Sequence, residues 1–456
     1  MNKYNEMLKK QKQFFFTDKT KSVSFRIEAL EKLLQAIKKY EEELMAALKI
    51  DLNKSAFDAY TTEIGILYQE IKFNKRHLKE WTKPNKVKTP LTHTGSKSYI
   101  YAEPYGSTLV IAPWNYPFQL AVAPIIGAIA AGNCVVLKPS ELTPTTSQVL
   151  NKLLSETFPE EYICVVEGGV ETSQALLKEP FDYLFFTGSV SVGKIMMEAA
   201  AKQLTPITLE LGGKSPCIVH KDAHLKLAAK RIAWGKFTNA GQTCVAPDYL
   251  YVDRQVKQEF LRELQKSILE LYGEQPLDNE DFTHIINVKH FNRLSAFLTD
   301  GETLLGGGTD KDRLVIEPTV LTNINWSDKV MGDEIFGPIL PIMEYENLTD
   351  VINEVNQHPK PLALYLFSES RKIQGQVMTQ ISYGGGCIND TIYHLSSPHL
   401  PFGGVGASGM GSYHGKAGFD TFSHKKSIMK QTTKFDIPLR YPNVKDGLKK
   451  IKLFLK

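Results

Sequence analysis

The sequence lacks the features that mark several specialised classes of protein. Only five cysteines occur in 456 residues and no two are spaced as Cys-x-x-Cys, so neither a disulfide framework nor a zinc site is expected. Basic and acidic residues are nearly balanced, 54 against 50, and the net charge of +4 gives no footprint for nucleic acid. We therefore expect a cytoplasmic protein that acts on a small molecule, with no metal and no nucleic-acid partner.

Long uninterrupted apolar runs are also missing. The most apolar segment, residues 120–137, is broken by Pro124, Gly127 and Gly132, which leaves less than the roughly 20 residues that a membrane-spanning helix needs. Residues 1–16 have neither a long apolar core nor a small-residue cleavage site, so they do not fit a secretion signal. The remaining composition, 42% apolar and 23% charged, is that of an ordinary folded protein.

The order of the apolar patterns predicts an α/β protein. Residues 22–50 carry leucines at helical spacing, and a second helical stretch runs from about Phe57 to Trp81. From Tyr99 onward, short β-rich runs alternate with helical runs, which predicts βαβ units and a parallel sheet covered by helices. At roughly 150 residues per domain the length suggests about three units, and we expect a junction near Leu209.

Two segments near the end of the sequence stand apart. Residues 401–415 are dense in glycine, which weakens both helix and strand, so an ordered loop is expected there. From Lys445 onward, lysines alternate with leucine and isoleucine in an amphipathic pattern that could contact a membrane or cover apolar protein surface. Because basic amphipathic ends are more often packed or solvated, membrane association is the less favoured interpretation.

Cys244 has the surroundings that best fit a nucleophile. Cys134, Cys164 and Cys217 lie in apolar strand-like runs, where burial raises the pKa of a thiol and makes it inert. Cys244 instead follows Asn, Gly, Gln and Thr in a polar turn, and Cys387 in GGGCIND is its only rival. For each of them a small buried apolar side chain is the alternative interpretation.

A catalytic thiol needs partners, because at a pKa of about 8.5 only a few per cent of it is thiolate at pH 7. Glu210 ends the β-rich run ITLEL before two glycines, which predicts a carboxylate at a strand end, where α/β sheets bind ligands. A structural glutamate at an exposed edge fits the local sequence equally well. Asn115 lies between the prolines of APWNYP and suits an oxyanion hole, although an asparagine that stabilises a turn is at least as common.

The nucleotide-binding signal is weaker. Gly188 and Gly193 follow an apolar strand in FFTGSVSVGK, but neither GxGxxG nor a complete P-loop is present. A strand, a glycine and a helix in that order still offer backbone amides and a helix N-terminus to a pyrophosphate. Lys138 and Glu141, in LKPSE, could hold ribose hydroxyls or could be solvent-exposed loop charges.

Taken together, the motifs resemble the aldehyde dehydrogenase superfamily along nearly the whole chain. In order they are PWNYP, KPSE, FTGSxxxGK, LELGGKSP, GQTC, EIFGP and PFGGVGxSGMG. The interval from Glu210 to Cys244, 244 − 210 = 34 residues, is the family's spacing between general base and nucleophile. GQTCVAPDY and EIFGPILP look most like the class 3 branch of dimeric enzymes, which oxidise medium-chain, long-chain fatty and aromatic aldehydes.

The resemblance implies a fold of three parts. These are a Rossmann-like NAD(P)-binding domain over residues 1–209, with a bridging strand near 95–105, and an α/β catalytic domain over residues 210–390. Residues 391–456 return to the first domain and supply a small β element for bridging or oligomerisation and the tail. A homodimer is the expected assembly.

The resemblance also implies the roles of individual residues. Cys244 becomes the nucleophile, Glu210 the base, and Asn115 with the Cys244 backbone amide the oxyanion hole. The implied cofactor-binding residues are Trp114, Lys138, Glu141, Thr187, Gly188, Ser189, Gly193, Glu334 and Phe336. The expected cofactor is NAD, with NADP tolerated, because Glu141 would repel a ribose 2′-phosphate that Lys138 would attract.

Two rival hypotheses follow from the same resemblance. An acylating relative would pass the thioester to coenzyme A, but such relatives generally lack the hydrolytic glutamate that stands here as Glu210. A catalytically silent binding protein would have no need of Cys244, Glu210 and Asn115 together. The sequence leaves the physiological aldehyde open, because the loops that would line a substrate tunnel cannot be placed from it.

Overall fold

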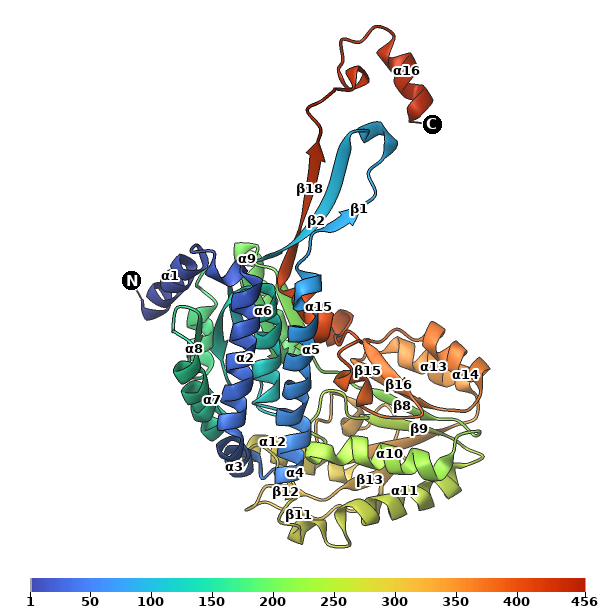
Figure 1. Ribbon diagram of the computed structural model, residues 1–456. Helices are drawn as coiled ribbons and strands as arrows, with labels where there is room; N and C mark the ends of the chain where they lie inside the picture. The colour runs from blue at the N-terminus through green and yellow to red at the C-terminus, as the bar shows by residue number, and fades with distance from the viewer. Residues whose placement is uncertain (1, 456) are drawn as a thin grey trace.

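The computed structural model describes residues 2–455, apart from the side chain of Phe454. Two lobes, each built on its own sheet, lie side by side, and a narrow arm projects away from them (Figure 1). Most strand pairs within the two large sheets are parallel, and helices cover them, so the predicted α/β class is confirmed.

The first lobe contains a six-stranded sheet in the order β17-β7-β6-β3-β4-β5. Five of its strands follow one another through helical connections and are parallel, whereas the two-residue β17 pairs antiparallel with β7. The parallel strands are buried because helices lie on both faces, which accounts for their continuous apolar runs. The strands are β3 (Ser107–Ile111), β4 (Cys134–Lys138), β5 (Ile163–Val165), β6 (Tyr183–Gly188), β7 (Ile207–Leu211) and β17 (Gly409–Met410).

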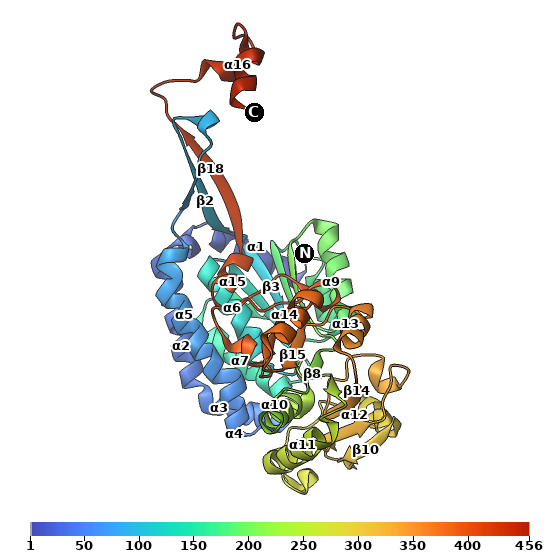
Figure 2. The ribbon, with the colours of Figure 1, turned by 90° about the vertical axis from the view of Figure 1, so that its right-hand side faces the viewer.

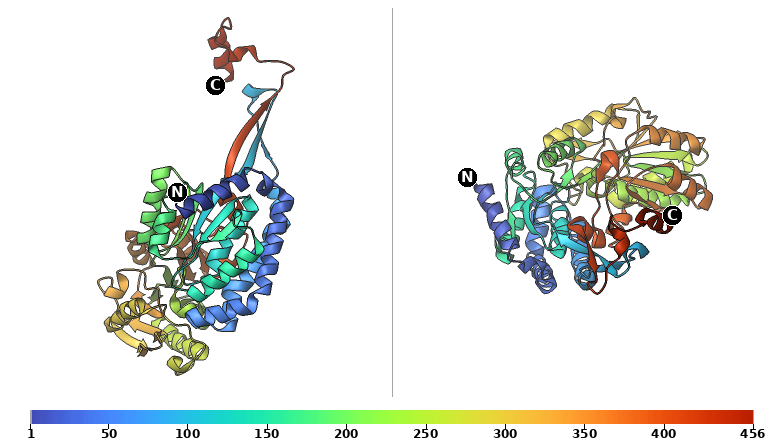
Figure 3. Two further views of the ribbon diagram at one scale, coloured as in Figure 1. Left: turned by 90° about the vertical axis from the view of Figure 1, so that its left-hand side faces the viewer. Right: turned by 90° about the horizontal axis from the view of Figure 1, so that it is seen from above.

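The connecting helices and the N-terminal helices enclose this sheet. Figure 3 shows the N-terminal helices, in blue, along one side of the lobe. The helical region expected over residues 22–50 is divided at Tyr40 into two helices, whose leucines are fully buried. The helices of the lobe are α1 (Lys3–Phe15), α2 (Val23–Lys39), α3 (Glu41–Leu52), α4 (Ala56–Ala59), α5 (Gly65–Trp81), α6 (Gln119–Ala131), α7 (Pro144–Thr157), α8 (Val170–Leu176), α9 (Val190–Gln203) and α15 (Gly415–Thr421).

The second lobe contains a seven-stranded sheet in the order β10-β13-β14-β9-β8-β15-β16. The chain enters it directly after β7, through the two glycines that precede β8. Its strands are β8 (Pro216–Val219), β9 (Tyr249–Asp253), β10 (Glu302–Leu305), β13 (Thr319–Thr322), β14 (Ile339–Tyr345), β15 (Ala363–Phe367) and β16 (Gly385–Ile388), and β11 (Thr309–Asp310) pairs with β12 (Val315–Ile316) beside them. Its helices are α10 (Leu225–Phe237), α11 (Lys257–Tyr272), α12 (Val288–Ser295), α13 (Leu348–Gln357) and α14 (Arg371–Gln380).

The arm is a three-stranded antiparallel sheet that stands clear of both lobes (Figures 1 and 2). It joins β1 (Asn85–Val87), β2 (Ser96–Pro104) and β18 (Ser423–Gln431), and the last two pair from Ser423 with Pro104 to Gln431 with Ser96. Beyond it lies α16 (Gly447–Phe454), on which Leu453 is 78% exposed. No helix among the described residues is both long and apolar enough to cross a membrane.

The glycine-rich segment 401–415 is ordered but not wholly a loop. It contains β17, which extends the first sheet, and a 3-10 turn at Gly406–Ser408. Gly409 has φ +140°, and a Cβ there would lie 2.1 Å from the carbonyl oxygen of Leu209. This close approach requires glycine, so the residue that weakens strands elsewhere is what lets β17 pair with β7.

Candidate active site

Cys244 lies between α10 and β9, in a loop whose backbone conformation is fixed by hydrogen bonds. Three successive residues before it, Asn239, Ala240 and Gly241, have positive φ angles of 56°, 51° and 70°. Such a conformation is costly for residues with a Cβ and persists only where the surroundings enforce it. The Gln242 side chain enforces it here, since its Nε2 donates to the Asn239 carbonyl at 3.2 Å and to the His284 carbonyl at 2.9 Å.

The structure brings Asn115 to this loop. Asn115 is 3% exposed, and its Nδ2 donates one hydrogen bond to the Gln242 carbonyl at 3.0 Å. Because Gln242 is two residues from Cys244, this bond fixes the side-chain amide of Asn115 close to the thiol. The second Nδ2 hydrogen has no partner among the residues that the structure describes. A preorganised amide donor beside the thiol is the arrangement that an oxyanion hole requires.

Glu210 lies at the end of β7, beside Thr187 of β6 and Gly409 of β17. It is 3% exposed, and neither carboxylate oxygen has a hydrogen-bond partner among the described residues. Burial raises the pKa of this carboxyl well above its ordinary value. An orphaned buried carboxyl is costly to a fold, which points to a chemical rather than a structural role.

The thiol of Cys244 is held protonated by its surroundings. Burial raises its pKa most, and the neighbouring carboxyls of Glu334 and Glu210 raise it further. The pKa therefore does not separate Cys244 from the strand cysteines Cys134, Cys164 and Cys217, whose thiol pKa burial also raises. Cys244 differs from the strand cysteines because an amide donor and two carboxyls lie near it. The local sequence could not show these neighbours.

The rival thiol, Cys387, has different partners. It lies in β16, and its Sγ is 3.5 Å from Nδ1 of His394. Burial raises the pKa of Cys387 and lowers that of His394 to about 4, so the imidazole is neutral at pH 7. Neither Glu210 nor Asn115 is bonded to this pair in the part of the chain that the structure describes.

Glu334 approaches the site from the loop before β14. Its carboxylate lies against the turn after β7, where a Cβ on Gly212 would meet it at 2.1 Å. Burial raises the pKa of Glu334 to about 8, with the nearby charge of Asp248 acting in the same direction. Next to it, Phe336 packs edge-on against Trp114 with 5.4 Å between ring centroids.

Replacement of Glu334 by Gln is expected to accelerate alkylation of Cys244 only at high pH. Below pH 8 the carboxyl is mostly neutral, so the amide changes little; above it, the native charge disfavours the thiolate. The rate at pH 9 to 10 should rise by up to about 10-fold, the equivalent of about one pKa unit. Iodoacetamide labelling followed by peptide mass spectrometry over pH 6.5 to 10 measures it, with surface-exposed Glu346→Gln as control. Equal rates for Glu334→Gln and the native protein at every pH would contradict the prediction.

The end of β6 and the start of α9 have the features of a pyrophosphate site. Ser189 caps α9 by accepting a hydrogen bond from the Val192 amide at 3.4 Å, and the first turn carries no acidic residue. The Thr187 hydroxyl is buried without a partner among the described residues. A Cβ on Gly193 would lie 2.7 Å from the side chain of Leu211. The absence of a side chain at Gly193 therefore lets α9 pack closely against the sheet. These features fit a dinucleotide phosphate.

Lys138 and Glu141 lie at the end of the neighbouring strand, β4. The Lys138 Nζ is 2.5 Å from a Glu141 carboxylate oxygen, and only Glu141 is appreciably exposed. The two charges therefore form a pair and are not independent loop residues. Of the sequence-predicted residues, Glu334 lies near enough to Cys244 to affect its pKa, and Trp114 and Phe336 pack together. Lys138 ends β4 of the first sheet, and Glu141 lies in the turn that follows it.

Sequence reasoning missed several side chains near the thiol or near Glu334. Tyr116 is partly buried, and its hydroxyl shares a 2.6 Å hydrogen bond with the hydroxyl of Thr243. Tyr413 is buried close enough to Glu210 and Cys244 that their charges help to raise its pKa. Lys236 is fully buried, its Nζ has no partner among the described residues, and burial lowers its pKa to about 8. The one available signal was the neighbourhood of Tyr116 within APWNYP.

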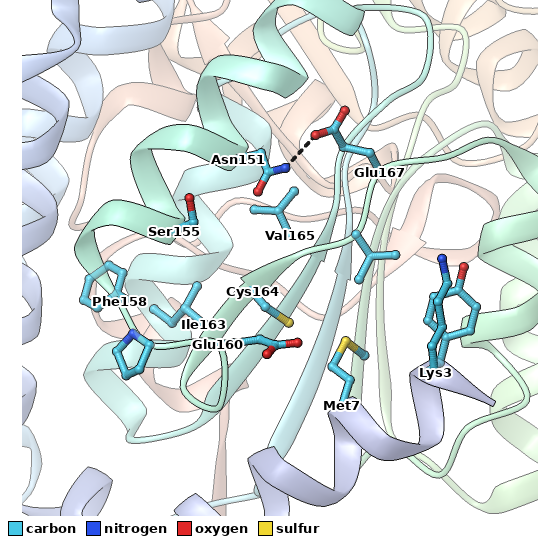
Figure 4. A pocket seen from close by; sticks show the side chains of 13 residues that line it. Lys3, Met7, Asn151, Ser155, Phe158, Glu160, Ile163, Cys164, Val165 and Glu167 are labelled. Atoms are coloured by element: carbon cyan, nitrogen blue, oxygen red, sulfur yellow. Dashed lines mark hydrogen bonds between the residues drawn. The ribbon is translucent and has the colours of Figure 1, made fainter. Parts of the chain in front are cut away.

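A separate hollow lies on the far edge of the first sheet. It has a volume of about 470 Å³ and lies between α1, α7 and β5 (Figure 4). Cys164 lines it, with its thiol pKa raised by burial to about 12, and Asn151 bonds Glu167 across one side at 2.7 Å. None of the predicted site residues lines this hollow, so it is not part of the candidate active site.

A thiol, an amide donor and a buried carboxyl lie where the parallel sheet of the first lobe meets the second α/β lobe. With a helix N-terminus suited to a dinucleotide phosphate beside them, these groups fit an oxidoreductase. A model of the aldehyde dehydrogenase family matches residues 2–428. The chain belongs to the aldehyde dehydrogenase family, as its motifs indicate.

Individual relatives place the chain near the class 3 branch. It is 50% identical to 4,4'-diaponeurosporen-aldehyde dehydrogenase of Staphylococcus aureus (strain NCTC 8325 / PS 47) over 100% of both chains. It is 44% identical to aldehyde dehydrogenase family 3 member A2 of Pongo abelii, over 94% of this chain and 89% of that one. A solved structure, described as a substrate-bound state of Staphylococcus aureus AldH, matches 100% of both chains with 50% identity and a TM-score of 0.98.

Proposed function

We propose that this enzyme oxidises an aldehyde to a carboxylate with NAD or NADP, through a covalent intermediate on Cys244. The observation that carries this mechanism is the bond from Asn115 Nδ2 to the Gln242 carbonyl, which holds an amide donor beside the thiol. Turnover of aldehydes, followed through NADH absorbance with chains of increasing length and with aromatic aldehydes, tests the proposal. Absence of NADH formation with every aldehyde would favour a silent binding protein.

The reaction begins at the thiol. Cys244 passes its proton to solvent, and its sulfur forms a bond to the carbonyl carbon while the π bond of the carbonyl breaks. The electron pair of that π bond places a negative charge on the former carbonyl oxygen. Asn115 and the Cys244 backbone amide stabilise this charge, and loss of one such donor typically costs about 10² to 10³ in rate. The nicotinamide cofactor, when bound, accepts the hydride that leaves the same carbon.

The residues near the thiol position that cofactor. Thr187, Gly188, Ser189 and Gly193 offer a hydroxyl, backbone amides and the N-terminus of α9 to the pyrophosphate. Glu334 would hold the hydroxyls of the nicotinamide ribose, and Phe336 and Trp114 would lie beside the ring. Their edge-on contact, 5.4 Å between centroids, supports a shared apolar wall at this place.

Glu210 completes the cycle by deprotonating the water that hydrolyses the thioester. Its raised pKa makes it a stronger base than an ordinary carboxylate once it is ionised. Transfer to coenzyme A is the alternative fate of the thioester. Coenzyme-A-dependent turnover faster than hydrolysis would establish that alternative.

Cofactor preference is expected to depend on the Lys138–Glu141 pair. The Glu141 carboxylate accepts a hydrogen bond from Lys138 Nζ at 2.5 Å, and it would repel a ribose 2′-phosphate. Glu141→Gln should therefore raise kcat/KM for NADP relative to NAD by about 10-fold, which corresponds to about 1.4 kcal/mol. Lys138→Met should shift the same ratio in the opposite direction. Parallel steady-state assays with both cofactors measure the ratio, and an unchanged ratio in both variants would remove these residues from cofactor selection.

We propose medium-chain, long-chain or aromatic aldehydes as substrates, and a cytoplasmic homodimer as the assembly. The projecting arm supports a dimer, because a sheet that stands clear of its own lobes has few contacts to stabilise it alone. Exposed Leu448 and Leu453 on α16 lie among lysines and can cover apolar protein surface. We favour that role for the tail over contact with a membrane.

A further inference from the structure

A fully buried ion pair lies beneath the turn that carries Asn115. Lys54, between α3 and α4, and Glu63, in the π-helical segment Tyr60–Ile64, are 1% and 0% exposed and are bonded to each other. Neither belongs to the motifs that identify the family. A π-helical turn inside a helix is uncommon and frequently occurs at functional sites.

The pair holds the turn at both of its ends. Lys54 Nζ donates to the backbone carbonyl of Asn115 at 3.1 Å. The second oxygen of Glu63 accepts from the amides of Phe118 at 2.9 Å and Gln119 at 3.1 Å, where α6 begins. Between these two points, Lys54 Nζ lies 4.1 Å from the ring centroid of Tyr116.

The same carbonyl links the pair to the nucleophile loop. Asn115 O accepts a second bond, from Asn239 Nδ2 at 2.9 Å, and Asn115 Nδ2 donates to Gln242 O. Lys54 thus joins a closed network in which the backbone and the side chain of Asn115 are both bonded to the loop that precedes Cys244. A shift of the Asn115 carbonyl would move its side-chain amide with it.

We propose that Lys54 and Glu63 are positioning residues that aim the Asn115 amide at the oxyanion. A buried ion pair contributes little net stability compared with apolar side chains of similar size, so stability alone does not account for it. Its contacts with the turn are specific: one carbonyl at Asn115 and two amides at the start of α6. This inference rests on the proposed role of Asn115 as an oxyanion donor.

The first test is Lys54→Met, with the rate of the NADH burst as the readout. The rate is expected to fall by about 10- to 100-fold, because a displacement of a catalytic donor by about 1 Å can cost up to 10². KM for the aldehyde should change less than about 3-fold, since the lost contact acts on the tetrahedral state. Alkylation of Cys244 by iodoacetamide forms no oxyanion, so its rate should stay the same. Loss of alkylation together with the burst would mean that the whole site has collapsed, which overturns a positioning role.

A double-mutant cycle separates positioning from general support of the fold. Asn115→Ala alone should slow the burst by about 10²-fold or more. In the Asn115→Ala background, Lys54→Met should slow the burst by less than about a further 3-fold. The reason is that Lys54 acts by positioning the Asn115 amide, which this background lacks. Multiplication of the two effects would overturn the proposal. A native burst rate in Asn115→Ala alone would instead overturn the oxyanion role of Asn115.

Arg26 provides a matched control. It is a buried cation that donates to backbone carbonyls, including that of Ala130 at 3.1 Å, near the other end of α6. Arg26→Met should lower the melting temperature but leave the burst rate as in the native enzyme. If Lys54→Met does not fold, the double variant Lys54→Met/Glu63→Gln removes both charges together and carries the same expected burst. A native burst rate in either folded variant would overturn the proposal.

Discussion

Replacement of Cys244 by serine is expected to remove NADH production, with a loss of at least about 10³-fold. A serine hydroxyl needs a strong base to attack a carbonyl. The charged groups that act on position 244 are the carboxyls of Glu334 and Glu210. Both have raised pKa values, but neither approaches the basicity needed to deprotonate an alcohol. Single-turnover absorbance at enzyme concentrations above those of the cofactor measures the loss.

Cys387→Ser is the matched control for this substitution. Cys387 is also half-buried, but its sulfur faces His394 rather than the loop of Asn115. This variant should retain native turnover, and iodoacetamide should still label Cys244 in it. The assignment of the nucleophile would move to Cys387 if Cys244→Ser kept substantial activity and Cys387→Ser lost it.

The alternation of strands and helices was predictable because each buried parallel strand is a continuous apolar run bounded by glycine, proline or polar residues. TLVI and NCVVL became β3 and β4, neighbours in the first sheet. The break at Tyr40 was not predictable, since the leucines of α2 and α3 keep a nearly common helical period across it. β17 was also missed, because its pairing with β7 joins Glu210 and Gly409, which are 409 − 210 = 199 positions apart.

The candidate site divides in the same way. The family motifs located Cys244, Glu210 and Asn115, because chemistry restricts which residue types stand there. No motif marks Lys54 and Glu63 as parts of the site. In the local sequence they are two charged residues in a helical region. Only their complete burial, and the bonds to a turn more than 50 residues away, connect them with the site.

Glu334 shows a further limit of sequence reasoning. Its place in EIFGP suggested a contact with the cofactor ribose. The structure adds that its carboxyl acts on the thiol, since it is the strongest charged influence on the pKa of Cys244. This electrostatic effect joins residues 90 positions apart, and it depends on how the loop before β14 folds onto the turn after β7. No local sequence pattern contains that arrangement.

Glu210→Gln is expected to stop the enzyme after a burst of about one NADH per active site. Neither oxygen of Glu210 bonds another described residue, so the amide breaks no hydrogen bond and should leave folding intact. Attack by Cys244 and hydride transfer do not need this carboxylate, whereas hydrolysis does, because water must lose a proton to attack the thioester. Steady-state turnover should fall by about 10² to 10⁴, the usual contribution of a general base.

The stalled state can be identified directly. Mass spectrometry of Glu210→Gln after the burst should show the acyl group on Cys244, and hydroxylamine, which attacks a thioester without a base, should restore NADH production. In the native enzyme, hydrolysis should become faster as the pH rises through the raised pKa of Glu210, because only the ionised form accepts a proton. If the burst vanishes together with turnover, then Glu210 also takes the proton from the thiol. That result would mean that the raised pKa of Cys244 leaves too little thiolate for attack at pH 7 when Glu210 is not there to accept its proton.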